Sequence, residues 1–209
     1  MTVMVIDVGE TIYNKYSLPL IKKLCDYNKI NLYVLNEDIP QNVYNLHPSW
    51  LKLFTFDLIK DDFIILWDLD LVPTKLYDFT KYFNEKTWNL CFDPAYKDFN
   101  YTFNGKFKYN CGLIGVPKKY SDDMKKLYID KGINSHYPSY EQYHINDKIY
   151  DENIDVSVVN YKLNTLFDGD ENFSDDIYNI HYTGKIDSNQ HRIDLIERHY
   201  NKYKGNFNL

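Results

Sequence analysis

The chain has 209 residues and carries a formal net charge of -6 at pH 7. This length predicts one domain with a full hydrophobic core, because it is too short for two ordinary domains and a linker. The negative charge argues against a nucleic-acid groove, and the lack of any apolar run of about 20 residues argues against a membrane span.

The cysteines are spaced in a way that matches no metal site, and each lies in an apolar context. They are Cys25, Cys91 and Cys111. An odd number of buried thiols is typical of a reducing compartment. No basic segment followed by an apolar one opens the sequence, so we also expect no secretion signal. These features predict a cytoplasmic protein.

The first segments alternate between strand and helix patterns. Residues 3–8 predict a strand, a helix follows with Ser17 as its cap, and residues 31–35 predict a second strand. The apolar face of this helix would consist of Leu20, Ile21, Leu24 and Cys25. A strand, helix, strand unit is typical of nucleotide-binding half-folds. Neither G-x-G-x-x-G nor a P-loop is present, which excludes a dinucleotide site and a Walker-type NTPase.

A second helix is expected to begin at Ser49, with Lys52 facing away from its apolar stripe. That stripe would consist of Trp50, Leu53, Phe54 and Leu58. Bulky apolar residues over 63–68 then predict a strand that is buried on both faces.

Asp68 and Asp70 close this buried strand. Alternate residues of a strand point to the same side, so both carboxylates would face one cation while Leu69 turns into the core. Mg²⁺ and Mn²⁺ take such oxygen ligands and often share them with substrate phosphates. The pair therefore predicts a metal–nucleotide site. A second D-x-D, at Asp168 and Asp170, lies in a polar loop and is interpreted as a turn.

The rest of the chain continues the mixed pattern. Gly112 and Gly115 interrupt an apolar strand, which indicates close approach of a ligand or of a neighbouring chain segment. The remaining predicted elements are a helix over 74–84, a strand over 88–92, a hairpin at Asn104-Gly105, a strand over 110–117, helices from Ser121 to Gly132 and over 139–150, strands near 155–159 and 177–182, and a helix over 187–203.

Four motifs in this order resemble the GT-A nucleotide-sugar glycosyltransferases, most closely those related to glycosyltransferase family 8. They are a strand ending in D-x-D, an N-x-G strand after a hairpin, an acid–Gln pair that opens a helix, and a late H-x-x-G-K. The chain also resembles small glycosyltransferase domains of chlorovirus-type algal viruses. The resemblance implies a single α/β GT-A domain, a Rossmann-like mixed sheet flanked by helices. Residues 1–70 would form its nucleotide-binding half, and 71–209 its acceptor-side half with a C-terminal metal and phosphate segment.

The resemblance implies a ligand set for the metal. Asp68 and Asp70 match the aspartates that hold Mn²⁺ against the diphosphate of a UDP-sugar, with Mg²⁺ as the alternative ion, and His181 matches the third protein ligand. Gly184 and Lys185 match the pair that contacts the phosphates. The family pattern has further spacing before its Lys-Pro-Trp, whereas Lys185 follows Gly184 directly here.

The resemblance also implies residues around the nucleotide. Thr11 and Tyr13, after the first strand, would flank the uracil and ribose, with Asp38 as a further candidate. Lys52 falls where these enzymes carry a basic residue near the donor.

Residues around the transferred sugar follow from the same comparison. Asn110 and Gly112 match the sugar and acceptor wall, and Glu141 with Gln142 matches the acid–Gln pair beside the anomeric carbon. Asp93 is the candidate general base if the reaction inverts.

Structural roles stay open for four of these residues. His181 would also suit a core or surface position, and Lys52 a solvated helix face. Gln142 would complete a capping box with Ser139, and Asp93 before a proline suits a turn.

Together the matches imply a metal-dependent hexosyltransferase that moves a sugar from a UDP-sugar, or another NDP-sugar, to a glycan acceptor with retention. A cation and a lysine would stabilise the charge on the departing diphosphate. The expected partners are the nucleotide-sugar donor and the glycan acceptor, with no nucleic acid, and the protein would be a monomer or weak dimer. A viral origin would place it in the host-cell cytoplasm.

Two alternatives remain. The sequence D-L-D-L-V also fits haloacid-dehalogenase-like phosphatases, in which Asp68 would be the nucleophile and Asp70 the acid and base. In those enzymes the motif normally closes the first strand, whereas two predicted strands and two predicted helices precede it here. A nucleotide-sugar-binding protein without turnover would carry the same donor-binding residues.

Overall fold

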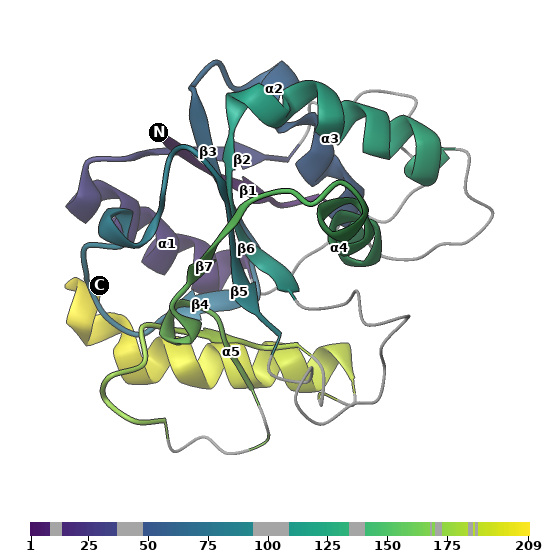
Figure 1. Cartoon of the computed structure of the whole chain (residues 1–209). Helices are drawn as coiled ribbons and strands as arrows, with labels where there is room; N and C mark the ends of the chain where they lie inside the picture. The colour runs from purple at the N-terminus through teal and green to yellow at the C-terminus, as the bar shows by residue number, and fades with distance from the viewer. Residues whose placement is uncertain are drawn as a thin grey trace.

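The computed structural model describes residues 1–8, 14–36, 48–93, 109–133, 141–167, 169, 173–183, 186 and 188–209. Two sheets organise these residues, and helices cover the larger sheet on both faces (Figure 1). The larger sheet has six strands, in the order β2 (Asn31–Leu35), β1 (Thr2–Ile6), β3 (Phe63–Trp67), β6 (Tyr109–Pro117), β5 (Trp88–Phe92) and β7 (Val156–Val159). The smaller sheet has three, in the order β4 (Leu71–Pro73), β9 (Asn179–His181) and β8 (Thr165–Leu166). The expected α/β class is confirmed.

The N-terminal unit has the predicted strand, helix, strand order. β1 (Thr2–Ile6) is followed by α1 (Asn14–Asn28) and by β2 (Asn31–Leu35), which pairs parallel to β1. The four predicted apolar residues of α1 are buried. The predicted cap is wrong, because Ser17 is buried inside the helix, which begins at Asn14.

The central strand β3 (Phe63–Trp67) is buried along its whole length. It pairs parallel to β1 on one side and antiparallel to β6 (Tyr109–Pro117) on the other. Phe63, Ile65 and Trp67 join the apolar cluster under α1, whereas Ile64 and Leu66 join the opposite cluster. A strand covered on both faces must be apolar at every position, which explains the uninterrupted run.

The two apolar clusters assign each helix to a face of the sheet. Side chains of α1 and α5 (Asn189–Tyr203) pack in one cluster. Side chains of the helical segment before β3, of α3 (Ser121–Leu127) and of α4 (Glu141–Asp151) pack in the other. Cys25, Cys91 and Cys111 are buried free thiols, as expected. Among the helices of the described residues, none combines the length and the apolar character needed to cross a bilayer.

The remaining elements complete the two layers. The helical segments are the 3-10 helix η2 (Pro48–Phe54), α2 (Thr55–Leu58), η3 (Thr80–Tyr82), η5 (Lys118–Tyr120), α3 (Ser121–Leu127), the π-helical turn η6 (Tyr128–Ile133), α4 (Glu141–Asp151), η7 (Tyr161–Leu163), α5 (Asn189–Tyr203) and η8 (Lys204–Phe207). The remaining strands are β4 (Leu71–Pro73), β5 (Trp88–Phe92), β7 (Val156–Val159), β8 (Thr165–Leu166) and β9 (Asn179–His181). The hairpin predicted at Asn104-Gly105 lies outside the described residues.

The helix predicted over 74–84 is wrong. After β4 the Thr74 backbone N–H donates to the Tyr178 carbonyl at 2.9 Å, which ties this segment to the chain before β9. The Asp78 carboxylate then accepts from the backbone N–H of Thr80 at 3.1 Å and from its hydroxyl at 2.7 Å. Such a local side-chain bond competes with the helix ladder, and the segment forms only the single 3-10 turn η3.

Candidate active site

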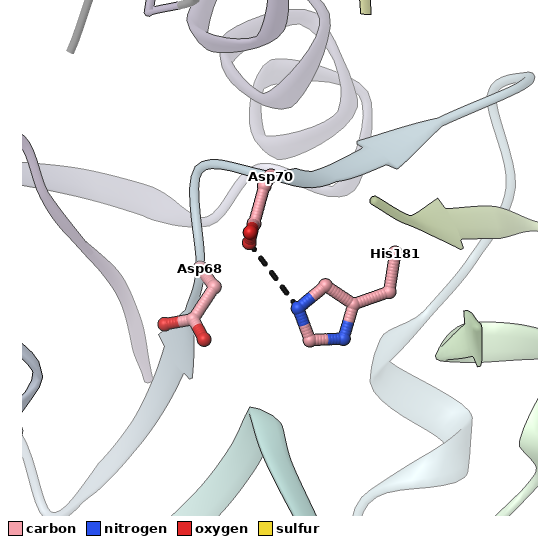
Figure 2. Close-up of side chains that lie close together, drawn as sticks. All are labelled: Asp68, Asp70 and His181. Atoms are coloured by element: carbon pink, nitrogen blue, oxygen red, sulfur yellow. Dashed lines mark ion pairs between the residues drawn. The ribbon is translucent and has the colours of Figure 1, made fainter. Parts of the chain in front are cut away.

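Asp68, Asp70 and His181 converge where the two sheets meet (Figure 2). Asp68 follows β3, Asp70 precedes β4, and His181 ends β9. One ligand atom from each lies within 4.8 Å of the others, and His181 Nε2 is 3.2 Å from Asp70 Oδ1. Leu69 is buried, as the alternation predicted. The structure therefore brings together the three predicted metal ligands.

Backbone bonds hold the turn between the two aspartates to both sheets. The Asp68 N–H donates to the Gly112 carbonyl of β6 at 2.9 Å, and the Tyr182 N–H after β9 donates to the Asp70 carbonyl at 2.8 Å. The Leu71 N–H closes the turn on the Asp68 carbonyl at 3.0 Å. The positions of both carboxylates thus depend on the sheets and not on a free loop.

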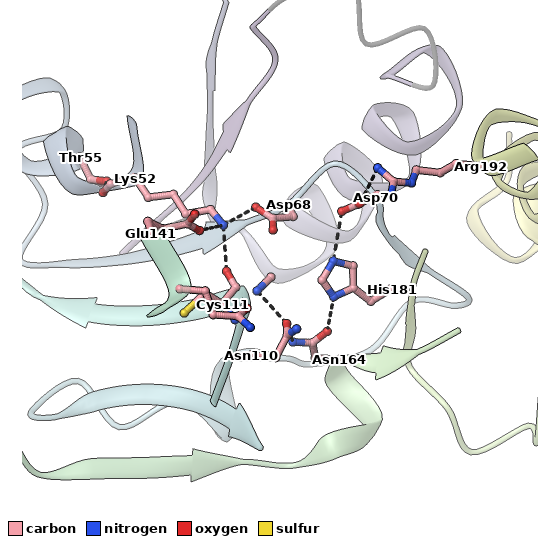
Figure 3. A network of polar contacts seen from close by, with 12 residues as sticks. Lys52, Thr55, Asp68, Asp70, Asn110, Cys111, Glu141, Asn164, His181 and Arg192 are labelled. Atoms are coloured by element: carbon pink, nitrogen blue, oxygen red, sulfur yellow. Dashed lines mark hydrogen bonds and ion pairs between the residues drawn. The ribbon is translucent and has the colours of Figure 1, made fainter. Parts of the chain in front are cut away.

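A relay of amides sets the tautomer of His181 (Figure 3). The Gly112 N–H, which can only donate, lies 2.9 Å from Asn110 Oδ1. Asn164 Nδ2 donates to the same oxygen at 2.8 Å, so Asn164 Oδ1 is the atom 2.9 Å from His181 Nδ1. His181 Nδ1 therefore carries a proton whether or not the ring is charged, which leaves Nε2 to pair with Asp70 or to bind a cation.

Gly112 leaves the space that the His181 ring occupies. A Cβ atom at this position would lie 2.2 Å from His181 Cε1 and 2.7 Å from Nδ1. No side chain fits at that distance, so the prediction that a glycine marks close approach of a neighbouring chain segment is confirmed. Gly115 has the same role in the core, where a Cβ would lie 2.6 Å from Phe83 Cδ1.

Lys52 is buried beside Asp68, with 3% of its surface exposed. Its ammonium lies 2.7 Å from Asp68 Oδ1, 2.8 Å from Glu141 Oε1 and 2.9 Å from the Cys111 carbonyl (Figure 3). The alternative role of Lys52, as a solvated charge on a helix face, is therefore wrong. A buried ammonium needs partners that replace water, and two carboxylates and a carbonyl supply them here.

The two aspartates differ in their electrostatic surroundings. Burial raises the pKa of Asp68 to about 6, although Lys52 opposes this rise. Burial acts on Asp70 as well, but His181 and then Arg192 outweigh it and hold the Asp70 pKa below its usual value.

The donor set suits a divalent cation. Among the described residues, the carboxylates of Asp68, Asp70 and Glu141 outnumber the lysine and arginine side chains that pair with them, Lys52 and Arg192. Two carboxylates and one imidazole nitrogen are typical ligands of Mn²⁺, and carboxylates also suit Mg²⁺. These residues fit the metal that the resemblance implied.

Helix α4 places the acid–Gln pair against β6. Gln142 Oε1 accepts the Cys111 N–H at 2.8 Å, and Asn146 bonds both the N–H and the carbonyl of Tyr109, at 2.8 Å and 2.9 Å. Lys52 lowers the pKa of the Glu141 carboxyl, although burial opposes this change. Both members of the pair are therefore held in place by contacts with the protein itself.

The other predicted residues are distributed as follows. Asp93 follows β5 and is 7% exposed. Outside the described residues lie Thr11, Tyr13, Asp38, Ser139, Gly184, Lys185, Asp168 and Asp170.

Arg192 and Asn164 contact the predicted metal ligands but were not predicted as site residues. Arg192, on α5, has Nη1 at 3.7 Å from Asp70 Oδ2, and Asn164 lies between η7 and β8. Arg192 is one of only two arginines in the sequence, which is a weak signal that it differs from the lysines. No pattern in the sequence singles out Asn164.

The sequence matches no family model and no curated protein. Solved structures do match its fold. A glycosyltransferase involved in the glycosylation of the major capsid of PBCV-1 has a TM-score of 0.67 at 16% identity, over 95% of this chain and 100% of that one. The glycosyltransferase GlyE of Streptococcus pneumoniae TIGR4 has a TM-score of 0.66 at 17% identity, over 99% of this chain and 62% of that one.

The galactosyltransferase LgtC, in complex with donor and acceptor sugar analogues, has a TM-score of 0.62 at 13% identity, over 97% of this chain and 96% of that one. The chain therefore has the fold of GT-A-type glycosyltransferases, as the ordered motifs predicted.

Proposed function

We propose that the protein is a metal-dependent glycosyltransferase that moves a hexose from a UDP-sugar, or another NDP-sugar, to a glycan acceptor with retention. The observation that carries this proposal is the convergence of Asp68, Asp70 and His181 within 4.8 Å, at the ends of strands in a glycosyltransferase fold. Ligands of open α/β sheets bind at the carboxyl ends of the strands, where these residues lie.

Asp68, Asp70 and His181 would hold Mn²⁺, or Mg²⁺ in its place. When bound, the ion would stabilise the negative charge that develops on the departing diphosphate. The protein supplies the orientation of these ligands: Lys52 holds Asp68, and the Asn110–Asn164 relay holds His181.

Gln142 would contact the donor sugar through its NH₂ group, because its carbonyl oxygen already accepts the Cys111 N–H. Glu141, which pairs with Lys52, would lie next to Gln142 beside the anomeric carbon. Asp93 would serve as base only if the reaction inverts. Asn110 and Gly112, which position His181, would also form part of the wall around the sugar and the acceptor.

We extend the proposal to residues outside the described part of the chain. Thr11, Tyr13 and Asp38 would bind the nucleoside, and Gly184 with Lys185 would contact the phosphates. Residues 1–70 would act as the nucleotide-binding half and 71–209 as the acceptor-side half. The protein would be cytoplasmic and a monomer or weak dimer.

The experiment that tests this function measures UDP binding and UDP release from a panel of UDP- and GDP-sugars, with Mn²⁺ and with EDTA. We expect Mn²⁺-dependent UDP binding that Asp70→Ala weakens by at least about 10- to 100-fold, because loss of a residue that only supports a metal ligand already costs that much. Asp62→Ala is the matched control, since that side chain is 98% exposed.

Other results would contradict the proposal. Hydrolysis of p-nitrophenyl phosphate without UDP-sugar binding would favour the phosphatase alternative, which the fold does not favour. Mn²⁺-dependent binding without UDP release, over the whole donor and acceptor panel, would identify a binding protein without turnover.

A further inference from the structure

Arg192 lies in the first turns of α5 and reaches the outer side of Asp70 (Figure 3). Its backbone N–H donates to the Ser188 carbonyl at 3.1 Å, and the buried Leu195 and Ile196 fix the same helix in the core. Its side chain is 25% exposed, so the guanidinium lies at the rim of the cluster. The helix therefore presents a positive charge beside the proposed metal ligands.

The contact of Arg192 with Asp70 is incomplete for an arginine–carboxylate pair. Only Nη1 approaches, at 3.7 Å from Oδ2, which is beyond hydrogen-bond distance. Arg192 Nε is buried and has no hydrogen-bond partner among the described residues. A guanidinium carries five N–H donors in a planar fork, and a buried donor without a partner is unfavourable. The geometry thus leaves donors of Arg192 available for an anion.

The composition of the chain supports a specific use of this side chain. The sequence has 24 basic residues, of which only Arg192 and Arg198 are arginines. A guanidinium binds two phosphate oxygens at once, whereas an ammonium acts as a point charge. Lysine would be sufficient if a counter-ion to Asp70 were the only requirement.

We propose that Arg192 is a further donor-binding residue, which contacts the diphosphate of the nucleotide when Asp70 binds the cation. This inference rests on the proposed function. Without a cation, Arg192 is a counter-ion of Asp70. Once Asp70 shares its charge with a divalent ion, its attraction for Arg192 weakens, and the guanidinium turns to the nearby phosphate oxygens. Its contact with Asp70 and its contact with the diphosphate are therefore alternatives.

If Arg192 contacts either Asp70 or the diphosphate, its substitution should affect the binding of Mn²⁺ and the binding of UDP differently. Arg192→Gln should bind Mn²⁺ alone at least as tightly as the wild type, because a cation competing for Asp70 has been removed. The same variant should bind UDP in saturating Mn²⁺ about 10- to 100-fold more weakly, which is the range expected for lost charge-assisted hydrogen bonds. UMP, which lacks the second phosphate, should lose less affinity than UDP.

The measurement is calorimetric titration of the full chain with Mn²⁺ alone, then with UDP and UMP in saturating Mn²⁺. Arg198→Gln is the matched control, since it changes the other arginine, at an exposed position of the same helix. Arg192→Lys keeps the positive charge but lacks the planar guanidinium. Its UDP affinity in saturating Mn²⁺ should lie between those of the wild type and Arg192→Gln. Arg192→Lys also serves as the test variant if Arg192→Gln fails to fold.

Two results would overturn the inference. Unchanged UDP affinity in the Arg192 variants would remove Arg192 from the donor site. Weaker binding of Mn²⁺ alone would show that Arg192 only supports Asp70. Failure of the wild type to bind UDP with Mn²⁺ is a separate outcome, which would refute the proposed function and this inference with it.

Discussion

At the scale of single residues, the site depends on a missing side chain. The His181 ring fills the space beside Gly112 where other residues carry a Cβ, and the same glycine donates its N–H to Asn110. Asn110 in turn orients Asn164, which fixes the ring nitrogen of His181. One backbone position therefore sets both the place and the tautomer of a proposed metal ligand.

Gly112→Ala should weaken binding of Mn²⁺ and lower stability. The added methyl would lie 2.2 Å from His181 Cε1, so the imidazole or β6 must move. Overpacking of this kind typically costs about 1–3 kcal/mol of folding free energy. Urea denaturation and calorimetric Mn²⁺ titration measure the two effects.

Gly205→Ala is the matched control for this variant, because a Cβ there would meet nothing within 4 Å. We expect it to behave like the wild type in both assays. Normal Mn²⁺ affinity in Gly112→Ala would show that His181 is not a ligand or that the ring has room to shift.

At residue level, the sequence singled out Asp68 and Asp70 because their position is physically unfavourable without a partner, and the structure places them beside His181. Two acids that close a buried apolar strand need a partner, and this pointed to Asp68 and Asp70. Lys52 offered no such signal, because a lysine on a helix is usually solvated, and its partner Glu141 comes from a distant helix. The role of Arg192 could not be predicted from the sequence, because it depends on the fold placing α5 beside Asp70.

At the scale of elements, α5 is attached to the small sheet through His199. Its Nε2 donates to the Pro73 carbonyl at the end of β4 at 2.9 Å, so Nδ1 accepts from the Tyr182 hydroxyl at 2.9 Å. Burial lowers the pKa of His199 to about 4. The native state therefore requires a neutral imidazole at this position.

This requirement predicts a loss of stability in mild acid. The unfolded histidine binds a proton below about pH 6.5 and the folded one only near pH 4, so stability is complete above pH 6.5 and falls as the pH drops toward 4. The contribution of His199 to this fall is about 3 kcal/mol at most. Urea denaturation between pH 4 and pH 7 measures it.

His199→Gln keeps a polar side chain without a titrating group, and it is the comparison for this measurement. We expect the variant to be less stable at pH 7, and the gap to the wild type to narrow as the pH falls. Carboxylates that titrate in the same range act on both proteins equally. Parallel stability profiles would contradict a neutral, buried His199.

Element prediction was accurate where an apolar run coincides with one strand of the large sheet. β2 and β3 lie where the alternating or uninterrupted runs placed them. The segment 74–84 has a helical spacing of apolar residues, but an Asp78–Thr80 turn and the bond from Thr74 to Tyr178 decide its structure. β4 and β8 are too short for any periodicity to show.

At the scale of the whole molecule, the site forms because one turn belongs to two sheets. Asp68 follows the central strand of the large sheet, and Asp70 precedes the first strand of the small sheet, whose middle strand carries His181. The α/β class was predictable from apolar runs between amphipathic segments. The antiparallel placement of β6 beside β3 and the existence of the small sheet depend on long-range pairing, which sequence periodicity does not encode.

The most direct test of the proposed donor site is anomalous diffraction from crystals of the protein grown with MnCl₂ and UDP. We expect one manganese peak in contact with Asp68, Asp70 and His181, with the diphosphate of UDP on the same ion. A peak at Asp168 and Asp170 instead, or UDP bound with no manganese between these three residues, would contradict the proposed site.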